Sequence, residues 1–160
     1  MTTYYHGTLD IFLDAIEREG LLASPEFRLL STQLIPGRLA RTDAIWVTDK
    51  ESAGWKWAYQ AAEHYEDEYG GPVRPVLLKI ERLPDGCKVE RDVLLDKGRE
   101  IDVPHSYRIF GCNIPPEHLQ VKSSPRSKYR PVRERRRAVP RSVNLQRRAV
   151  RVRQHLRRRA

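Results

Sequence analysis

The chain has 160 residues, with 30 Lys or Arg against 21 Asp or Glu, and a formal net charge of +9. It is long enough for one hydrophobic core with an appendage, and no apolar run approaches the roughly 18 residues that a membrane-spanning helix needs. The first residues lack the basic and apolar regions of a secretory signal peptide, so we expect a cytoplasmic protein without membrane contacts.

The charge is divided unevenly along the chain. Residues 122–160 contain 16 of the bases and a single acid, whereas residues 1–121 contain 14 bases and 20 acids. The net charges of the two parts are therefore +15 and −6. We predict a monomeric folded domain over residues 1–121. The Arg-rich tail over 122–160 has few large apolar residues, so we expect it to be disordered or partly helical in isolation.

The first predicted elements are a strand and a helix. The strand covers residues 3–7, and the helix that follows has apolar residues at spacings of three and four, which make one stripe. Thr8 is the expected N-cap, and Gly20 is expected to end the helix in a left-handed conformation. Residues 23–43 show no regular period and predict a long surface loop.

The middle of the chain predicts a strand that passes directly into a second helix. The strand is AIWVT (44–48), and the helix covers 51–69 until Gly-Gly-Pro ends it. Thr48 with Glu51 three residues later has the pattern of a capping box. VRPVLLKIE (73–81) predicts a buried strand, and CKVERDVLL, HSYRIFGCN and EHLQV predict later strands. Together these elements predict an α+β fold.

Metal and nucleotide motifs are sparse. Cys87 and Cys112 have no CxxC spacing, which favours reduced thiols over a disulfide or a zinc site. The five histidines are scattered without an acid cage, so we expect no metal. Neither GxGxxG nor GxxxxGK[ST] occurs, which excludes the Rossmann and P-loop patterns.

The pentapeptide YYHGT (4–8) is unusual for a strand that only fills a core. Such a strand favours Val or Ile at the position of His6 and avoids glycine at the position of Gly7. Gly7 lets a ligand approach the backbone closely, and His6 offers a hydrogen-bonding ring at the same place. The alternative interpretation is a strand end with an exposed histidine and a turn glycine.

Four segments occur in an order that resembles the ADP-ribosyltransferase superfamily. They are YYHGT before a helix ending in EGLL, AIWVT before ESAGWKWA, PVLLKIE before KVERD, and finally PHSYRIFGCNIPPEHLQV. Members of the superfamily begin with a Tyr-His-Gly-Thr or Tyr-His-Gly-Ser strand. Among the small members, the chain looks most like the rifampin ADP-ribosyltransferase family. The features shared with that family are the aromatic strand ending in Thr48, Trp57-Ala58 and Ser106-Tyr107-Arg108.

The resemblance covers most of residues 3–121 and implies a split β-sheet core with flanking helices. It also implies NAD as a co-substrate. The nicotinamide–ribose bond of NAD breaks through an oxocarbenium-like transition state, so a nearby carboxylate stabilises the positive charge that develops on the ribose. Trp46 stands where the family has a tyrosine. The implied NAD-binding residues are His6, Gly7, Thr8, Trp46 and Tyr107.

The catalytic acid has more than one candidate. Aligning KVERD with the acidic turn of the rifampin-modifying family suggests Asp92, with Glu90 beside it. Placing the acid on the later strand, as in the toxin-like members, suggests Glu100, which Asp102 follows. We rank Asp92 first, Glu100 second and Glu90 third, while noting that alternating charges are also typical of an exposed strand face.

The resemblance implies NAD-dependent ADP-ribosyl transfer, a glycosyltransferase reaction, with an acceptor on or near nucleic acid. One alternative is a non-enzymatic nucleic-acid-binding protein that retains the fold, which the Trp in place of Tyr keeps open. Another is an RNA 2′-phosphotransferase, since VLLKIE, DG and IPPEHL are similar to those enzymes. We expect the tail to bind DNA or RNA phosphates with little sequence preference. Its candidate contacts are Arg135, Arg136, Arg137, Arg147, Arg148, Arg157, Arg158 and Arg159.

Overall fold

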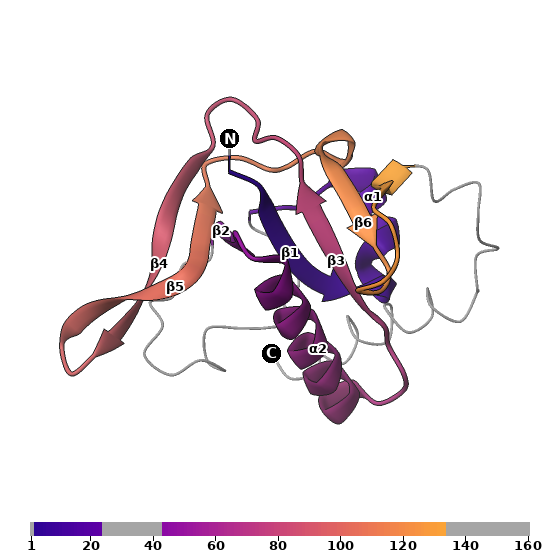
Figure 1. The fold of residues 1–160 in the computed structure, drawn as a ribbon, viewed down its shortest axis with the longest axis horizontal. Helices are drawn as coiled ribbons and strands as arrows, with labels where there is room; N and C mark the ends of the chain where they lie inside the picture. Colours follow the sequence, from indigo (N-terminus) through magenta and orange to yellow (C-terminus); the bar gives the residue numbers. More distant parts are fainter. Residues whose placement is uncertain (1, 24–42, 134–160) are drawn as a thin grey trace, which may run out of the picture.

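The computed structural model describes residues 2–23 and 43–133. Within them, antiparallel strands form a seven-stranded sheet in the order β4-β5-β2-β1-β3-β6-β7 (Figure 1). The α+β class predicted from the sequence is confirmed. The elements are β1 (Tyr4–Leu9), a 3₁₀ turn (Asp10–Phe12), α1 (Leu13–Glu19), β2 (Ala44–Thr48), α2 (Glu51–Tyr69), β3 (Pro75–Ile80), β4 (Lys88–Asp96), β5 (Arg99–Phe110), a second 3₁₀ turn (Pro116–His118), β6 (Leu119–Lys122) and β7 (Arg130–Pro131).

The two helices cover opposite faces of the sheet. Successive residues of a strand point to opposite faces. On β3, Leu78 packs in the main core with Ile16 of α1, whereas the preceding residue, Leu77, packs with Trp55 and Ala58 of α2. β3 is therefore buried on both faces, which explains its nearly continuous apolar sequence.

The helix ends follow the sequence signals more closely than the helix starts. Gly20 and Gly70 end α1 and α2 with φ angles of 78° and 70°, values at which glycine is favoured. Thr8, the expected N-cap of the first helix, instead continues β1, because it pairs with Val76 on β3 and the ladder extends to Leu9. The α-helix therefore begins later, after a 3₁₀ turn.

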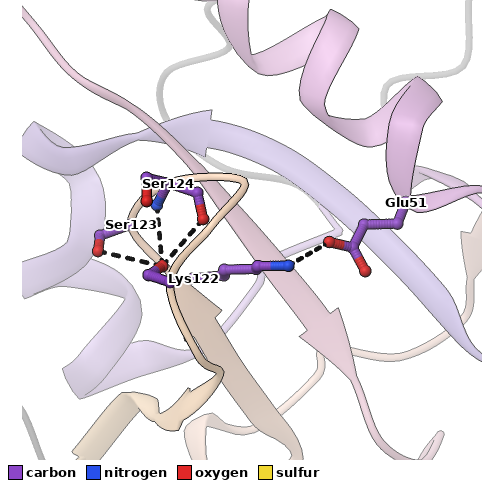
Figure 2. Close-up of polar contacts among 5 residues, drawn as sticks. Glu51, Lys122, Ser123 and Ser124 are labelled. Atoms are coloured by element: carbon purple, nitrogen blue, oxygen red, sulfur yellow. Dashed lines mark hydrogen bonds and ion pairs between the residues drawn. The ribbon is translucent and has the colours of Figure 1, made fainter.

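The predicted capping box at the start of α2 is not formed. The hydroxyl of Thr48 accepts a hydrogen bond from the backbone nitrogen of Lys50 at 3.1 Å. The carboxylate of Glu51 instead contacts the ammonium group of Lys122 at 2.5 Å, as Figure 2 shows. A charged partner binds a carboxylate more strongly than a backbone amide does, so Glu51 ties α2 to β6.

Gly7 is required for packing between β1 and α2. A Cβ atom at Gly7 would overlap the carbonyl oxygen of Gly54 and lie 2.7 Å from the backbone nitrogen of Ala58. The space that the sequence assigned to a ligand is therefore filled by the helix. This corrects the expected role of Gly7, and the reason is that a close backbone approach leaves the same glycine signal whether the neighbour is a ligand or a helix.

Gly7→Ala should lower the free energy of unfolding by about 2–3 kcal/mol, because the new methyl group meets backbone that cannot rotate away. Chemical denaturation measures this change. Gly70→Ala is the control: it meets no atom within 4 Å and adds only the strain of its positive φ, about 1 kcal/mol. Equal stability of Gly7→Ala and the wild type would show that β1 is not pressed against α2 in solution.

The folded core extends beyond the predicted boundary at residue 121. β6 continues to Lys122 and pairs with β7, and Val132 is fully buried in the main core. The domain boundary must therefore move to residue 133 or later. This segment cannot be recognised in the sequence, because a single core valine among polar and basic residues forms no repeating apolar pattern. The predicted surface loop, apart from its two end residues, and the eight arginines predicted to contact nucleic acid lie outside the described residues.

Cys87 and Cys112 form a disulfide, with their Cα atoms 5.1 Å apart. The expectation of two reduced thiols is therefore wrong. The hairpin brings the two cysteines together, because Lys88 at the start of β4 pairs with Phe110 at the end of β5. A pairing set by strand register has no short-range spacing in the sequence, so a search for CxxC does not find it.

Candidate functional site

The sheet is split between β1 and β2. One residue pair, Tyr5 with Thr48, joins these strands. By contrast, six pairs join β1 to β3 and five join β2 to β5. The sheet therefore consists of two halves, β4-β5-β2 and β1-β3-β6-β7, whose strands separate on either side of a single contact. We call this junction the β1–β2 split.

His6 bridges the split. Its Nδ1 atom lies 2.8 Å from the carbonyl oxygen of Trp46 on β2. Because a carbonyl only accepts, Nδ1 carries the proton, and in the neutral ring Nε2 keeps the lone pair that accepts from a hydroxyl group. The imidazole thus supplies a hydrogen bond across strands whose backbones have separated. Two of the predicted NAD-binding residues, His6 and Trp46, are in direct contact.

A second polar cluster lies at the end of β2, next to the same junction. The carboxylate of Asp49, the residue after Thr48, accepts a hydrogen bond from Nδ1 of His105 at 2.8 Å. Its other oxygen accepts from the hydroxyl of Tyr107 at 3.2 Å. The side chain of Asp49 is 24% exposed. A hollow of about 300 Å³ is lined by Asp49, Arg91 and residues 102–107.

Aromatic contacts connect this cluster to the first motif. The rings of Tyr107 and Tyr4 meet edge to face, with centroids 5.6 Å apart. Tyr4 and His6 are two residues apart on β1, about 7 Å along the strand. Burial, followed by the hydrogen bond to Asp49 and its charge, raises the pKa of Tyr107 above the ordinary value of 10.0. Tyr107 is therefore a neutral donor toward Asp49 at pH 7.

The strand that carries His105 and Tyr107 has a wide bulge. Arg91 pairs with Tyr107, and the next pair is Val93 with Asp102, so residues 103–106 face Asp92 alone. His105 has a φ of 58°, which a non-glycine residue rarely adopts and which costs on the order of 1 kcal/mol or more. Bulges of this kind occur next to active sites, where they redirect side chains.

Asp92, the first-ranked catalytic acid, supports the bulge from inside. It is fully buried, and its carboxylate accepts a hydrogen bond from the hydroxyl of Ser106 at 2.9 Å. A ligand on the surface cannot touch a carboxylate that has no exposed area. The ranking of Asp92 as the catalytic acid is therefore not supported by its position, and we assign it a role in holding β5.

The other two candidate acids are also placed away from the cluster. Glu90 contacts Arg108 at 3.1 Å, and the side chain of Arg108 is only 10% exposed, so Glu90 neutralises a nearly buried cation. Glu100 pairs with Leu95 near the exposed end of the β4–β5 hairpin, which extends from the sheet in Figure 1. It is six residues before Ser106, or about 20 Å along the strand.

Asp49 and His105 were missed by the sequence reasoning. Asp49 comes directly after AIWVT, whereas the predicted catalytic acids belong to KVERD and to the later strand with Glu100. The signal available was the Asp in the TDKE that follows the strand. Thr8, another predicted NAD-binding residue, is buried on β1 on the same side as His6.

Two general findings concern the described residues. Within 2–23 and 43–133, no group of three or more His, Cys, Asp or Glu side chains is arranged to hold a metal ion. No helix in these ranges has the length and apolar character needed to cross a membrane.

Comparison of the chain with family models, with curated proteins and with solved structures gives no match.

Proposed function

We propose that this protein is an NAD-dependent ADP-ribosyltransferase-like enzyme with an acceptor on or near nucleic acid. The observation that carries the proposal is the β1–β2 split. Residues selected by resemblance from three distant segments, His6, Trp46 and Tyr107, all lie at this junction. The split also supports the specific fold that the resemblance implies, a sheet in two halves with helices on its faces.

The hollow beside the split suits one end of a dinucleotide. Its volume of about 300 Å³ is at the lower end of small-molecule sites, which are about 300–1,000 Å³. It therefore accommodates a nucleoside-sized group such as nicotinamide riboside, while the rest of the molecule extends along the surface. Tyr107 lines the hollow with an aromatic ring, and His6 crosses the adjoining β1–β2 split.

We assign the catalytic carboxylate to Asp49. Cleavage of the nicotinamide–ribose bond develops positive charge on the ribose, and a fixed negative charge stabilises it best when it does not have to reorient. Both oxygens of Asp49 are held, one by His105 and one by Tyr107. The same carboxylate is partly exposed at the hollow, which none of the three acids from the sequence achieves.

NAD should raise the melting temperature of the wild-type chain, and His6→Ala should remove most of that shift. Ligand at 100 times its Kd stabilises by about 2.7 kcal/mol, which moves the melting temperature of a chain of this size by about 5–10 °C. Differential scanning fluorimetry measures both proteins. His64→Ala is the matched control, because His64 is a half-buried histidine of α2. This variant should keep the full shift in melting temperature. If saturating NAD leaves the melting temperature of the wild type unchanged, the proposal is wrong.

The reaction itself is tested with NAD labelled on the adenylate. Free nicotinamide is quantified by chromatography, and label is followed onto DNA, RNA, added protein and the chain itself. Release of nicotinamide with label on one of these identifies the acceptor. NAD binding without release would favour the alternative of a binding protein that retains the fold.

A further inference from the structure

The last described segment of the chain is strongly basic. Residues 122–133 contain five Lys or Arg and no acid, whereas residues 1–121 have an excess of acids. The segment follows β6 and returns as β7, so it lies at the edge of the sheet farthest from β4. The positive charge of the predicted tail therefore begins inside the folded domain, before residue 134.

Two of the five cations are used within the fold. Lys122 is 12% exposed and contacts Glu51, and Arg133 contacts Glu117 at 3.2 Å. The other three, Arg126, Lys128 and Arg130, are exposed. In the described part of the chain, none of these three makes an ion pair. Three uncompensated positive charges therefore lie within five residues.

The turn that carries these cations is held in one shape. The hydroxyl of Ser127 donates to the carbonyl of Ser124 at 2.9 Å and accepts from the backbone nitrogen of Ser124 at 3.0 Å. The backbone nitrogen of Ser127 also donates to that carbonyl, at 3.1 Å. Figure 2 shows Ser123 and Ser124 directly after Lys122, whose ammonium group reaches Glu51 on α2.

Tyr129 anchors the return of the same turn. Its ring lies beneath two ammonium groups, that of Lys79 at 5.6 Å and that of Lys122 at 5.1 Å from the ring centroid. The ring is also 6.5 Å from that of Tyr5 on β1. Lys128 and Arg130 therefore flank a residue that is packed on the sheet, so little backbone entropy is lost when they bind a partner.

We propose that the turn over residues 123–130 is a docking surface for the sugar-phosphate backbone of nucleic acid. Arg and Lys side chains with serine hydroxyls and backbone amides are the groups that contact phosphates in such complexes. Residues 134–160, which follow in the sequence, contain eleven more arginines. This inference concerns binding alone and does not depend on the proposed reaction with NAD.

The composition of the turn favours nucleic acid over an anionic membrane. Peripheral membrane binding combines basic residues with apolar side chains that insert below the headgroups. The exposed large apolar residues of the described chain lie on α2 and on the β4–β5 hairpin, and none lies on the turn. They are Tyr59, Val89, Leu95 and Ile101.

The test uses the full-length chain and the triple variant Arg126→Ala, Lys128→Ala, Arg130→Ala. Affinity for a labelled single-stranded RNA and a labelled duplex DNA is measured by anisotropy between 50 and 200 mM salt. Each phosphate contact contributes about 0.9 to the slope of log K against log salt on duplex DNA. The triple variant should therefore bind more weakly, with a slope flatter by about 2–3.

The matched control removes three positive charges from the opposite edge of the sheet. It is Lys88→Ala, Lys97→Ala, Arg99→Ala, all exposed on the β4–β5 hairpin, and it should keep the wild-type slope. Ser127→Ala keeps every charge but releases the turn, so it should weaken binding several-fold at an unchanged slope. Melting curves check that each variant is folded.

Three outcomes would overturn the inference. One is an unchanged salt slope in the triple variant at Arg126, Lys128 and Arg130. Another is an equal loss of affinity in that variant and in the matched control on the β4–β5 hairpin, which would mean that only net charge matters. The third uses phosphatidylserine vesicles: if the turn variant loses vesicle binding and keeps nucleic-acid binding, the surface faces a membrane. Unchanged affinity in Ser127→Ala would show that the turn does not hold its shape through this hydroxyl.

Discussion

Asp49→Asn should lower the rate of nicotinamide release by about 10²–10³-fold, the effect of removing one preorganised electrostatic partner of a transition state. The amide keeps the size of the carboxylate, so NAD should still raise the melting temperature. The loss should therefore appear in kcat and only weakly in KM. Initial rates of nicotinamide release, measured with the thermal shift of the same protein, separate the two effects.

The controls for this prediction are the acids that the sequence ranked. Glu100→Gln, at the exposed end of the hairpin, should leave the rate unchanged. Asp92→Ala removes the buried acceptor of the Ser106 hydroxyl and should lower the melting temperature without NAD, because it loosens the bulge. A full rate in Asp49→Asn combined with a loss in Glu100→Gln would return the catalytic role to the later strand.

The affinity of the full chain for nucleic acid should fall by about 10³–10⁵ between 50 and 200 mM salt, if 6–10 phosphates are contacted. A shortened chain that ends at Arg133 lacks the eleven arginines of residues 134–160 and should bind far more weakly with a flatter salt slope. It should stay folded, because the sheet and the main core lie within the described residues. Anisotropy across the salt range and a melting curve check both statements.

A chain that ends at Val121 is the informative comparison. It lacks β7 and Val132, whose side chain is fully buried, and it should be destabilised by more than about 2 kcal/mol. If that shorter chain loses nucleic-acid binding, the loss would reflect unfolding as well as the removal of positive charges. Affinity that is equal in the full chain and the chain ending at Arg133 would mean that the tail is not a nucleic-acid arm.

The elements of the fold could largely be predicted, because their signals are local. α2 begins and ends where its apolar stripe and the Gly-Gly-Pro sequence indicated, and Gly20 ends α1. Start signals were less reliable: Thr8 and Glu51 both have the residue types of caps, yet Thr8 stays in the β1 ladder and Glu51 contacts a lysine. A strand pairing or an ion pair from a distant segment outweighs a cap.

The candidate site could be predicted only in part. Histidine and aromatic residues were selected by resemblance, and His6 and Trp46 do meet. Asp49 follows the aromatic strand in the sequence, but its contact with His105 depends on a bulge that places four residues of β5 opposite Asp92. No periodicity reports such a bulge, which hides Asp92 and brings His105 to Asp49. The same limit applies to Val132 and to the disulfide, since both depend on strand register.

The single ladder pair between β1 and β2 makes the sheet mechanically uneven. Within each half, several residue pairs join neighbouring strands, such as the six between β1 and β3. Between the halves, the pair of Tyr5 with Thr48 and the His6 side chain are two links that cross within the described residues. Of the neighbouring strands, β1 and β2 share the fewest ladder pairs, so backbone pairing resists relative rotation of the two halves least at this split. A molecule bound across the β1–β2 split acts as an added cross-link, and the restriction of that rotation reduces its net binding free energy.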